Sequence, residues 1–261
     1  MTTLELKMVK LLKELRDKHG VVEVKAEFEA EASRIHEVMR LKDVANQANL
    51  GLVLKIGGAE GITDMFEAQH IGTTVLIAPM VESAYALRKY LEAIEKHFPK
   101  ELTASMHFGV NIETKLAYNN FPEMLKEKKL SYVDTITVGR VDLSGSMGLA
   151  RDQINSDEMY AIVEDIFTQA KKKKYRTTMG GGIGPEAAPF IKKLVKKGLI
   201  DRFETRKIVF TIPKGIQKIH DAIVAANMFE LLWLENKKNY YERIFHEDDD
   251  RIKMLQKRIK E

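Results

Sequence analysis

The sequence alternates short apolar, β-branched segments with amphipathic helical segments, joined by short links. This alternation is typical of a parallel sheet with crossover helices and favours an α/β fold, most simply a (β/α)8 barrel of the TIM type. We expect strands at residues 21–31, 50–58, 73–78, 103–112, from 133 to near Asp142, 176–179 and 203–210. We expect helices at residues 4–15, 33–48, 62–70, 84–95, 122–126, 157–172 and 186–197.

Seven strands are clear, whereas a closed barrel of this type needs eight. Either a short strand is hidden near the N-terminus or the barrel is modified. The middle of the chain carries no Pro/Ser-rich linker, so we expect one barrel domain with its N-terminal helix over residues 1–215.

Residues 216–261 are nearly all compatible with helix, with a break expected at the acidic run 246–250. This region is unusually apolar for surface helices, and exposing that much apolar area would be unfavourable. We therefore expect it to be an oligomerisation element that packs on another copy of the chain. The apolar residues are Phe229, Leu231, Leu232, Trp233, Leu234, Tyr240, Tyr241, Ile244 and Phe245.

Composition narrows the function classes. The chain has no Cys, which excludes disulfides, thiolate zinc sites and cysteine nucleophiles. The formal net charge is +4, and the Lys-rich places lie on helix-like segments beside acids, so nucleic acid is not expected as a partner. No apolar run is long enough for a membrane span and the start does not resemble a signal peptide, so we expect a cytoplasmic protein without a membrane partner.

Polar residues at the carboxyl ends of the predicted strands should meet at one edge of the barrel, where barrel enzymes carry their chemistry. Glu113 and Asp142 end two neighbouring strands and offer oxygen ligands suited to Mg²⁺ or Mn²⁺. No His pair has the spacing of a zinc site. The backbone N–H groups of Gly139, Arg140 and Val141, before a turn of small residues, could hold a substrate carboxylate.

Two features of this edge allow more than one interpretation. Residues 21–31 alternate polar and apolar residues, so the acids either form a solvated face of an edge strand or reach the mouth of the site. Arg206 either lines the site or pairs with Glu204, and the pair is slightly favoured.

Three segments resemble the HpcH/HpaI family, the class II pyruvate aldolases and citrate lyase β-subunits of the phosphoenolpyruvate/pyruvate barrel superfamily. They are residues 78–83 (APMVES), 110–114 (VNIET) and 138–148 (VGRVDLSGSMG). The resemblance covers roughly residues 21–210. It implies Glu113 and Asp142 as ligands of a divalent cation, and a metal-stabilised enolate formed when an oxo acid or acyl-CoA is cleaved or extended. Lys55 stands where the family has an Arg that polarises the keto oxygen.

The sequence departs from the family at the proton-transfer end. The aldolases carry an Asp-Gly-Glu-His turn with a catalytic His, and this chain has EFEAE at residues 27–31 instead. Glu27 and Glu29 are therefore candidates for the general acid/base. Arg140 replaces a family Pro and either binds a second anionic group of the substrate or points into solvent.

The prediction is a carbon–carbon lyase or aldolase dependent on Mg²⁺ or Mn²⁺. Its partners would be a small oxo acid, such as pyruvate or oxaloacetate, or an acyl-CoA, together with further copies of the chain. The alternative is a catalytically altered barrel that acts as a binding or regulatory subunit.

Overall fold

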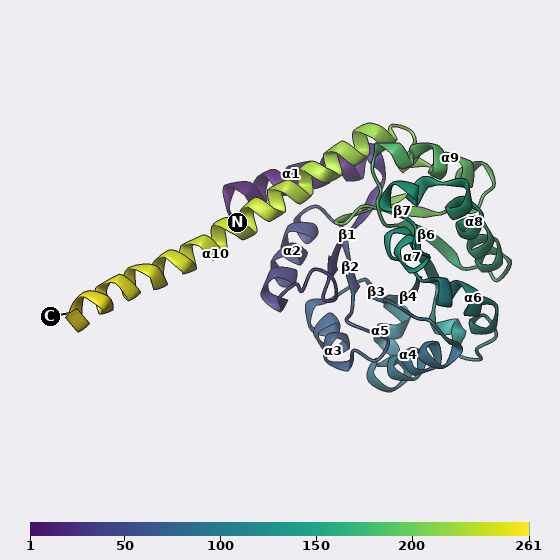
Figure 1. The fold of residues 1–261 in the computed structure, drawn as a ribbon, viewed down its shortest axis with the longest axis horizontal. Coiled ribbons are helices and arrows are strands. Elements are labelled where there is room, and N and C mark those ends of the chain that lie inside the picture. Colours follow the sequence, from purple (N-terminus) through teal and green to yellow (C-terminus); the bar gives the residue numbers. More distant parts are fainter. Residues whose placement is uncertain (261) are drawn as a thin grey trace.

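A computed structural model describes residues 1–260 and shows a closed barrel in which eight strands follow one another in sequence order (Figure 1). Neighbouring strands from β1 to β7 run parallel. The α/β barrel predicted from the alternating pattern is confirmed. The strands are β1 (Val21–Glu27), β2 (Gly51–Lys55), β3 (Val75–Ala78), β4 (His107–Ile112), β5 (Thr135–Gly139), β6 (Arg176–Gly180), β7 (Arg202–Glu204) and β8 (Ile208–Thr211).

Helices surround the barrel, and most of them connect one strand to the next on the outside of the sheet (Figure 1). They are α1 (Thr3–His19), α2 (Ile35–Gln47), α3 (Ile62–Ile71), α4 (Ala84–His97), α5 (Lys100–Ser105), α6 (Lys115–Met124), α7 (Arg140–Ser146), α8 (Asp157–Lys172), α9 (Ala188–Lys196) and α10 (Ile219–Lys260). None of the helices in residues 1–260 is long and apolar enough to cross a membrane.

The eighth strand comes from the segment predicted as a single strand at 203–210. Residues 205–207 form a turn closed by the backbone N–H of Thr205 donating to the carbonyl of Ile208 at 2.9 Å. β8 consequently runs antiparallel to β7 and also to β1. Three residues cannot form the crossover that a parallel strand needs. The barrel is thus modified at its closure, and the alternative of a hidden strand near the N-terminus was wrong.

The barrel has a large apolar layer between strands and helices and a small one inside. On β2, Leu52 and Leu54 face the helices, while Val53 belongs to the inner cluster with Val75, Ile77 and Val209. β1 follows the same alternation, but its inward side chains are charged: Glu23, Lys25 and Glu27 are all buried. The interpretation of β1 as an edge strand with a solvated face was therefore wrong.

The C-terminal region is one helix of 42 residues, so the break predicted at 246–250 was wrong. α10 packs along α1 next to the barrel, and its C-terminal part projects away from the rest of the chain (Figure 1). The acidic run stays helical, and Lys253 pairs with Asp249 one turn earlier at 2.5 Å.

Some predicted element boundaries were also wrong. Residues 100–105 form α5, so the strand predicted from 103 starts only at His107. α2 begins at Ile35, with Arg34 as its N-cap, rather than at residue 33. α6 begins earlier than residue 122, because the Thr114 hydroxyl accepts a hydrogen bond from the N–H of Ala117 and caps it.

Candidate functional site

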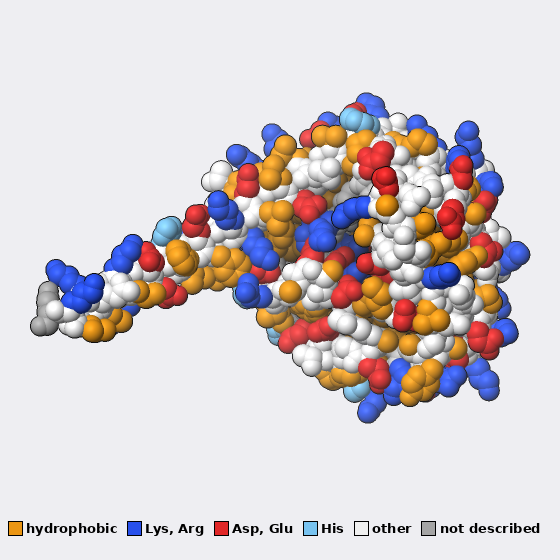
Figure 2. All heavy atoms as spheres, viewed as in Figure 1, with side chains coloured by type: hydrophobic (Ala, Val, Ile, Leu, Met, Phe, Trp, Pro, Cys, Tyr) orange, Lys and Arg blue, Asp and Glu red, His pale blue; other side chains and the backbone are white. Residues whose placement is uncertain are grey.

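A cavity of about 410 Å³ lies at the carboxyl ends of the strands. Figure 2 shows the hollow in the middle of the barrel face, with basic and acidic side chains around it. Its lining includes seven of the nine predicted site residues, together with Lys25, Glu204 and two residues of α10, Asn227 and Glu230. The edge predicted to carry chemistry is therefore hollow and strongly charged.

Glu113 follows β4 directly and lies deep in the pocket wall, with a residue exposure of 1%. Its Oε1 accepts the backbone N–H of Met80 at 3.0 Å, and its Oε2 accepts Nδ2 of Asn111 at 2.9 Å. Burial raises the pKa of Glu113, the charge of Lys55 partly offsets this, and the charge of Asp142 adds to the rise. The carboxylate is held in one orientation close to a second acid and a cation.

Asp142 also lines the pocket, but it does not end a strand. β5 stops at Gly139 and the chain turns directly into α7, so Asp142 lies in the first turn of a short helix. The predicted tight loop was wrong at this point. Asp142 and Glu113 nevertheless line the same cavity, and the charge of Asp142 contributes to the raised pKa of Glu113.

Lys55 ends β2 and forms ion pairs with Glu27 and Glu29, the two acids predicted for proton transfer. Its Nζ lies 2.6 Å from Oε2 of Glu29 and 3.8 Å from Oε2 of Glu27. Burial alone would lower the pKa of Lys55, but the charges of Glu113 and Glu27 outweigh it, so the pKa is raised. Lys55 and Glu27 line the cavity, while Glu29, in the turn after β1, contacts Lys55 from outside the cavity lining.

Lys25 and Glu204 complete this charged group. The sequence analysis considered Glu204 at this edge only as a possible partner of Arg206 and left Lys25 out of the site. Nζ of Lys25 lies 2.5 Å from Oε1 of Glu204 and 3.0 Å from Oε1 of Glu27. Burial opposes the charge on Lys25, yet the two carboxylates raise its pKa above the usual value. Burial would raise the pKa of Glu27, but Lys25 and Lys55 hold it below the usual value. Lys25 and Glu27 lie two residues apart on β1, so their side chains face the same side of the strand. This spacing is the sequence signal that could have placed Lys25 in the site.

Gly139 and Val141 line the cavity, but the side chain of Arg140 does not. Arg140 is fully buried, and its guanidinium donates to the carbonyls of Ile154, Gly181 and Gly182 and to Oδ1 of Asn155, at 2.7–3.2 Å. It also lies over the ring of Phe190. Neither a substrate contact nor the solvent position considered for Arg140 matches this arrangement. Its side chain instead fixes the loop after β6 against α7.

Arg206 lines the cavity mouth, in agreement with one of its two predicted placements. It does not pair with Glu204 as favoured. Its nearest acid is Glu31, with Nη1 to Oε1 at 3.9 Å, while Glu204 faces Lys25. The turn 205–207 separates the two residues because Glu204 ends β7 and points into the barrel.

The residues present fit a hard divalent cation. Within residues 1–260, no group of three or more His, Cys, Asp and Glu side chains is arranged to hold a metal. The candidate ligands are therefore the two carboxylates in the cavity, those of Glu113 and Asp142. Oδ1 of Asn111 is buried beside Glu113 and has no hydrogen-bond partner in the described chain, so one more oxygen is free. Mg²⁺ commonly takes one or two carboxylates, with water and substrate completing its octahedron.

The sequence of residues 18–178, more than half of the chain, matches the family model described as HpcH/HpaI aldolase/citrate lyase. The chain belongs to this family. Family members are aldolases and lyases, which agrees with the enzyme class expected from the motifs. None of the curated proteins is significantly similar to this sequence.

Solved structures of two HpcH/HpaI proteins and of a citrate synthase share the fold. The aldolase from Desulfitobacterium hafniense DCB-2 has a TM-score of 0.61 at 16% identity, over 78% of this chain and 83% of that one. Citrate synthase SbnG has a TM-score of 0.63 at 15% identity, over 86% and 89%. A family protein from Burkholderia cenocepacia J2315 has a TM-score of 0.57 at 13% identity, over 91% and 99%. At these identities the likeness concerns the fold.

Proposed function

We propose that this HpcH/HpaI protein is a carbon–carbon lyase or aldolase that needs Mg²⁺ or Mn²⁺ and acts on an oxo acid or an acyl-CoA. The observation that supports this most is the pair Glu113 and Asp142 in one cavity, next to the unpaired oxygen of Asn111. The cavity lies at the carboxyl edge of the barrel, where enzymes of this fold carry their active sites.

Glu113 and Asp142 would hold the ion, with Asn111 as a further oxygen ligand or a ligand to its water. When bound, the metal supplies a Lewis acid for negative charge that develops on substrate oxygens. Asn111 and the N–H of Met80 keep the Glu113 carboxylate oriented. The backbone of Gly139 and Val141 remains the proposed contact for a substrate carboxylate.

Lys55 and Lys25 act as cations in this proposal. Their raised pKa values keep both amines protonated near neutral pH, which makes them poor nucleophiles for Schiff-base chemistry. The charge of Glu113 helps to raise the pKa of Lys55, so Lys55 is the cation placed to stabilise a substrate oxygen beside Glu113. This is the role of the family Arg, without the forked geometry of a guanidinium.

Glu27 is the proposed proton acceptor. Its lowered pKa keeps it ionised near neutral pH, so it can accept a proton but is a poor donor. Glu29 contributes through Lys55, which it contacts at 2.6 Å. Arg206, at the mouth, is proposed to contact a second anionic group of the substrate.

The test combines metal binding with activity. We expect Mn²⁺ to bind in titration calorimetry and oxaloacetate decarboxylation to require Mg²⁺ or Mn²⁺. Asp142→Asn and Glu113→Gln should lose both, while Glu158→Gln, an exposed residue on α8, should keep both. Wild-type protein that binds no divalent ion in calorimetry would rule out the metal-dependent enzyme and leave the binding or regulatory subunit.

A further inference from the structure

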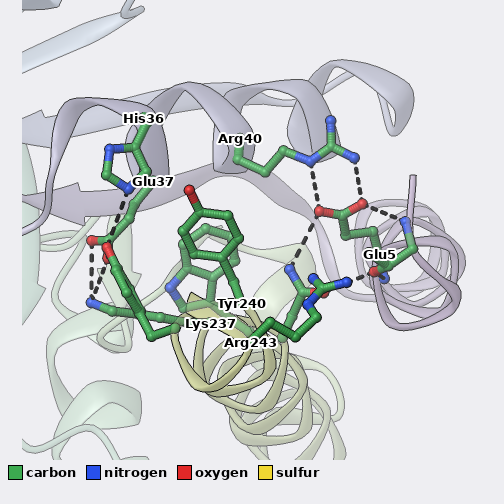
Figure 3. Close-up of a pocket in the computed structure, with 11 residues that line it drawn as sticks. Glu5, His36, Glu37, Arg40, Lys237, Tyr240 and Arg243 are labelled. Carbon is green, nitrogen blue, oxygen red and sulfur yellow. Dashed lines mark hydrogen bonds and ion pairs between the residues drawn. The ribbon is translucent and has the colours of Figure 1, made fainter. Parts of the chain in front are cut away.

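A second cavity, of about 300 Å³, lies between α1, α2 and α10 (Figure 3). We call it the α10 cavity. Its lining includes Glu5, Glu37, Trp233, Tyr240 and Arg243, and it shares no lining residue with the cavity of the candidate active site. It is therefore a separate hollow of the molecule, and its side chains show what it could bind.

Glu5, at one end of the α10 cavity, has no acceptor position left for a ligand. Its Oε1 accepts Nε of Arg40 at 2.6 Å and Nδ2 of Asn236 at 3.3 Å. Its Oε2 accepts Nη2 of Arg40 and the backbone N–H of Thr2. An ionised carboxylate has about four acceptor positions, and all of those of Glu5 are used within the chain.

Glu37, at the other end of the cavity, is paired as well (Figure 3). Its Oε1 accepts the hydroxyl of Tyr241 at 2.6 Å. Its Oε2 accepts Nζ of Lys237 at 3.1 Å and the backbone N–H of Arg34 at 3.0 Å. Burial opposes the ionisation of Glu37, but these hydrogen bonds outweigh it and lower the pKa. Both acids of the cavity are thus engaged, and neither is free to bind a cationic ligand.

One cation of the cavity has no acidic partner. Three basic side chains, Arg40, Lys237 and Arg243, line the cavity, and the first two pair with its two acids. Arg243 is exposed, and its Nε donates to the carbonyl of Asn239 at 3.2 Å, but within residues 1–260 it forms no ion pair. Its two terminal nitrogens remain available to an anion. A carboxylate suits them best, because a guanidinium can bind it with two parallel hydrogen bonds.

Aromatic side chains form another part of the wall. Figure 3 shows Tyr240 in the middle of the cavity, between Glu37 and Glu5. Tyr240 is 44% exposed, and its ring centroid lies 6.0 Å from that of His36. Trp233 lines the same cavity and is buried. A flat ring packs well against such side chains, in offset or edge-to-face contact.

We propose that the α10 cavity binds a small aromatic carboxylate, with its carboxylate on Arg243 and its ring against Trp233 and Tyr240. The volume of about 300 Å³ is at the lower end of the range for small-molecule sites, so it suits one ring with a short acid rather than a nucleotide. The single unpaired cation suits a single negative charge.

The position of the α10 cavity makes this ligand an effector rather than a substrate. A smaller hollow of about 240 Å³ lies between the two cavities along α10. Trp233 and Lys237 line both this hollow and the α10 cavity, while Arg206 and Glu230 line both this hollow and the catalytic cavity. The ligand therefore contacts side chains next to the mouth of the catalytic cavity without entering it. Its binding does not depend on the reaction proposed there.

Trp233 makes binding measurable, because it is the only Trp in the chain. Benzoate is the probe, added to the full-length protein without divalent ions. We expect a saturable change in Trp233 emission, with the same dissociation constant in titration calorimetry. Benzylamine has a similar shape and the opposite charge, and it should give no saturable change. A protein that does not respond to benzoate, or that responds equally to benzylamine, would overturn the proposal.

Two variants of α10 and one of the catalytic cavity locate the site. Arg243→Gln should raise the benzoate dissociation constant at least about tenfold, because it removes the charge-assisted pair. Arg251→Gln, an exposed Arg of the same helix outside the cavity, should bind like the wild type. Asp142→Asn should also bind like the wild type, whatever its effect on activity. Unchanged affinity in Arg243→Gln, or lost binding in Asp142→Asn, would contradict a benzoate site at α10.

Discussion

Gly139 offers a sharp test of the metal site because it packs against Glu113 and has no side chain that could bind a metal. A Cβ at residue 139 would lie 2.4 Å from Oε2 and 3.0 Å from Cβ of Glu113. The backbone at Gly139 has φ −90° and ψ 94°, which any L-residue adopts, so Gly139→Ala perturbs the site by contact alone.

The size of the effect follows from these distances. Ordinary contact begins near 3.4 Å, so the Glu113 carboxylate must move by about 1 Å, and such a displacement exceeds the roughly 0.5 Å that a site tolerates. We expect Mn²⁺ affinity to fall at least about tenfold and turnover by up to about 100-fold. Overpacking should also lower the free energy of unfolding by about 1–3 kcal/mol.

The matched control is Gly145→Ala, in α7, where a new Cβ would meet nothing within 4 Å. This helical glycine should gain about 0.5–1 kcal/mol in stability and leave Mn²⁺ binding unchanged. Calorimetry with Mn²⁺, thermal unfolding and oxaloacetate decarboxylation would be measured for both variants. A folded Gly139→Ala protein with wild-type Mn²⁺ affinity would refute the role of Glu113 as a metal ligand.

Three further predictions follow from the charged groups. A hydrogen bond from Arg40, assisted by the backbone N–H of Thr2, lowers the pKa of Glu5 from 4.5 to about 2, so the ionised carboxylate contributes stability above pH 4.5 that is lost as the pH falls toward 2. Denaturant titrations should thus show that Arg40→Met destabilises the protein at pH 7 and less at pH 3; an equal effect at both would contradict this. Since Lys55 opposes the burial that raises the pKa of Glu113, Lys55→Met should move the acid limb of Mn²⁺ binding to higher pH, and Lys55→Arg should not; coincident limbs would count against it. Arg140→Met leaves buried carbonyls unpaired and should cost about 2–4 kcal/mol in chemical denaturation, whereas a loss under 0.5 kcal/mol would show that the guanidinium is dispensable.

The local pattern of the sequence determined the barrel architecture and the edge of the barrel at which the candidate site lies. Apolar, β-branched runs alternate with amphipathic segments, and period and length distinguish most of the strands from the helices. The carboxyl ends of parallel strands always meet at one edge, so the sequence could place Glu113 and Lys55 near each other, whereas it left open whether Glu27 reaches the site. The resemblance at residues 138–148 added the family.

Only the tertiary structure decided features that depend on contacts between residues far apart in the chain. The turn at 205–207 divides one predicted strand into β7 and β8. β8 then closes the barrel by pairing with β1, which already pairs with β2 on its other side. Arg140 turns inward because Gly181 and Gly182, some forty residues later, offer it carbonyl oxygens. The pairing of Lys25 with Glu204 joins β1 to β7 across the barrel, and the sequence carries no signal for a partner 179 residues away.

The C-terminal helix shows the same division. The sequence predicted helix and an unusually apolar composition for residues 216–261. Which apolar residues of α10 are covered by the chain's own barrel, and which stay exposed, depends on where Glu37 and Glu5 contact α10. Periodicity specifies the faces of a helix, whereas only packing decides which face each neighbour takes.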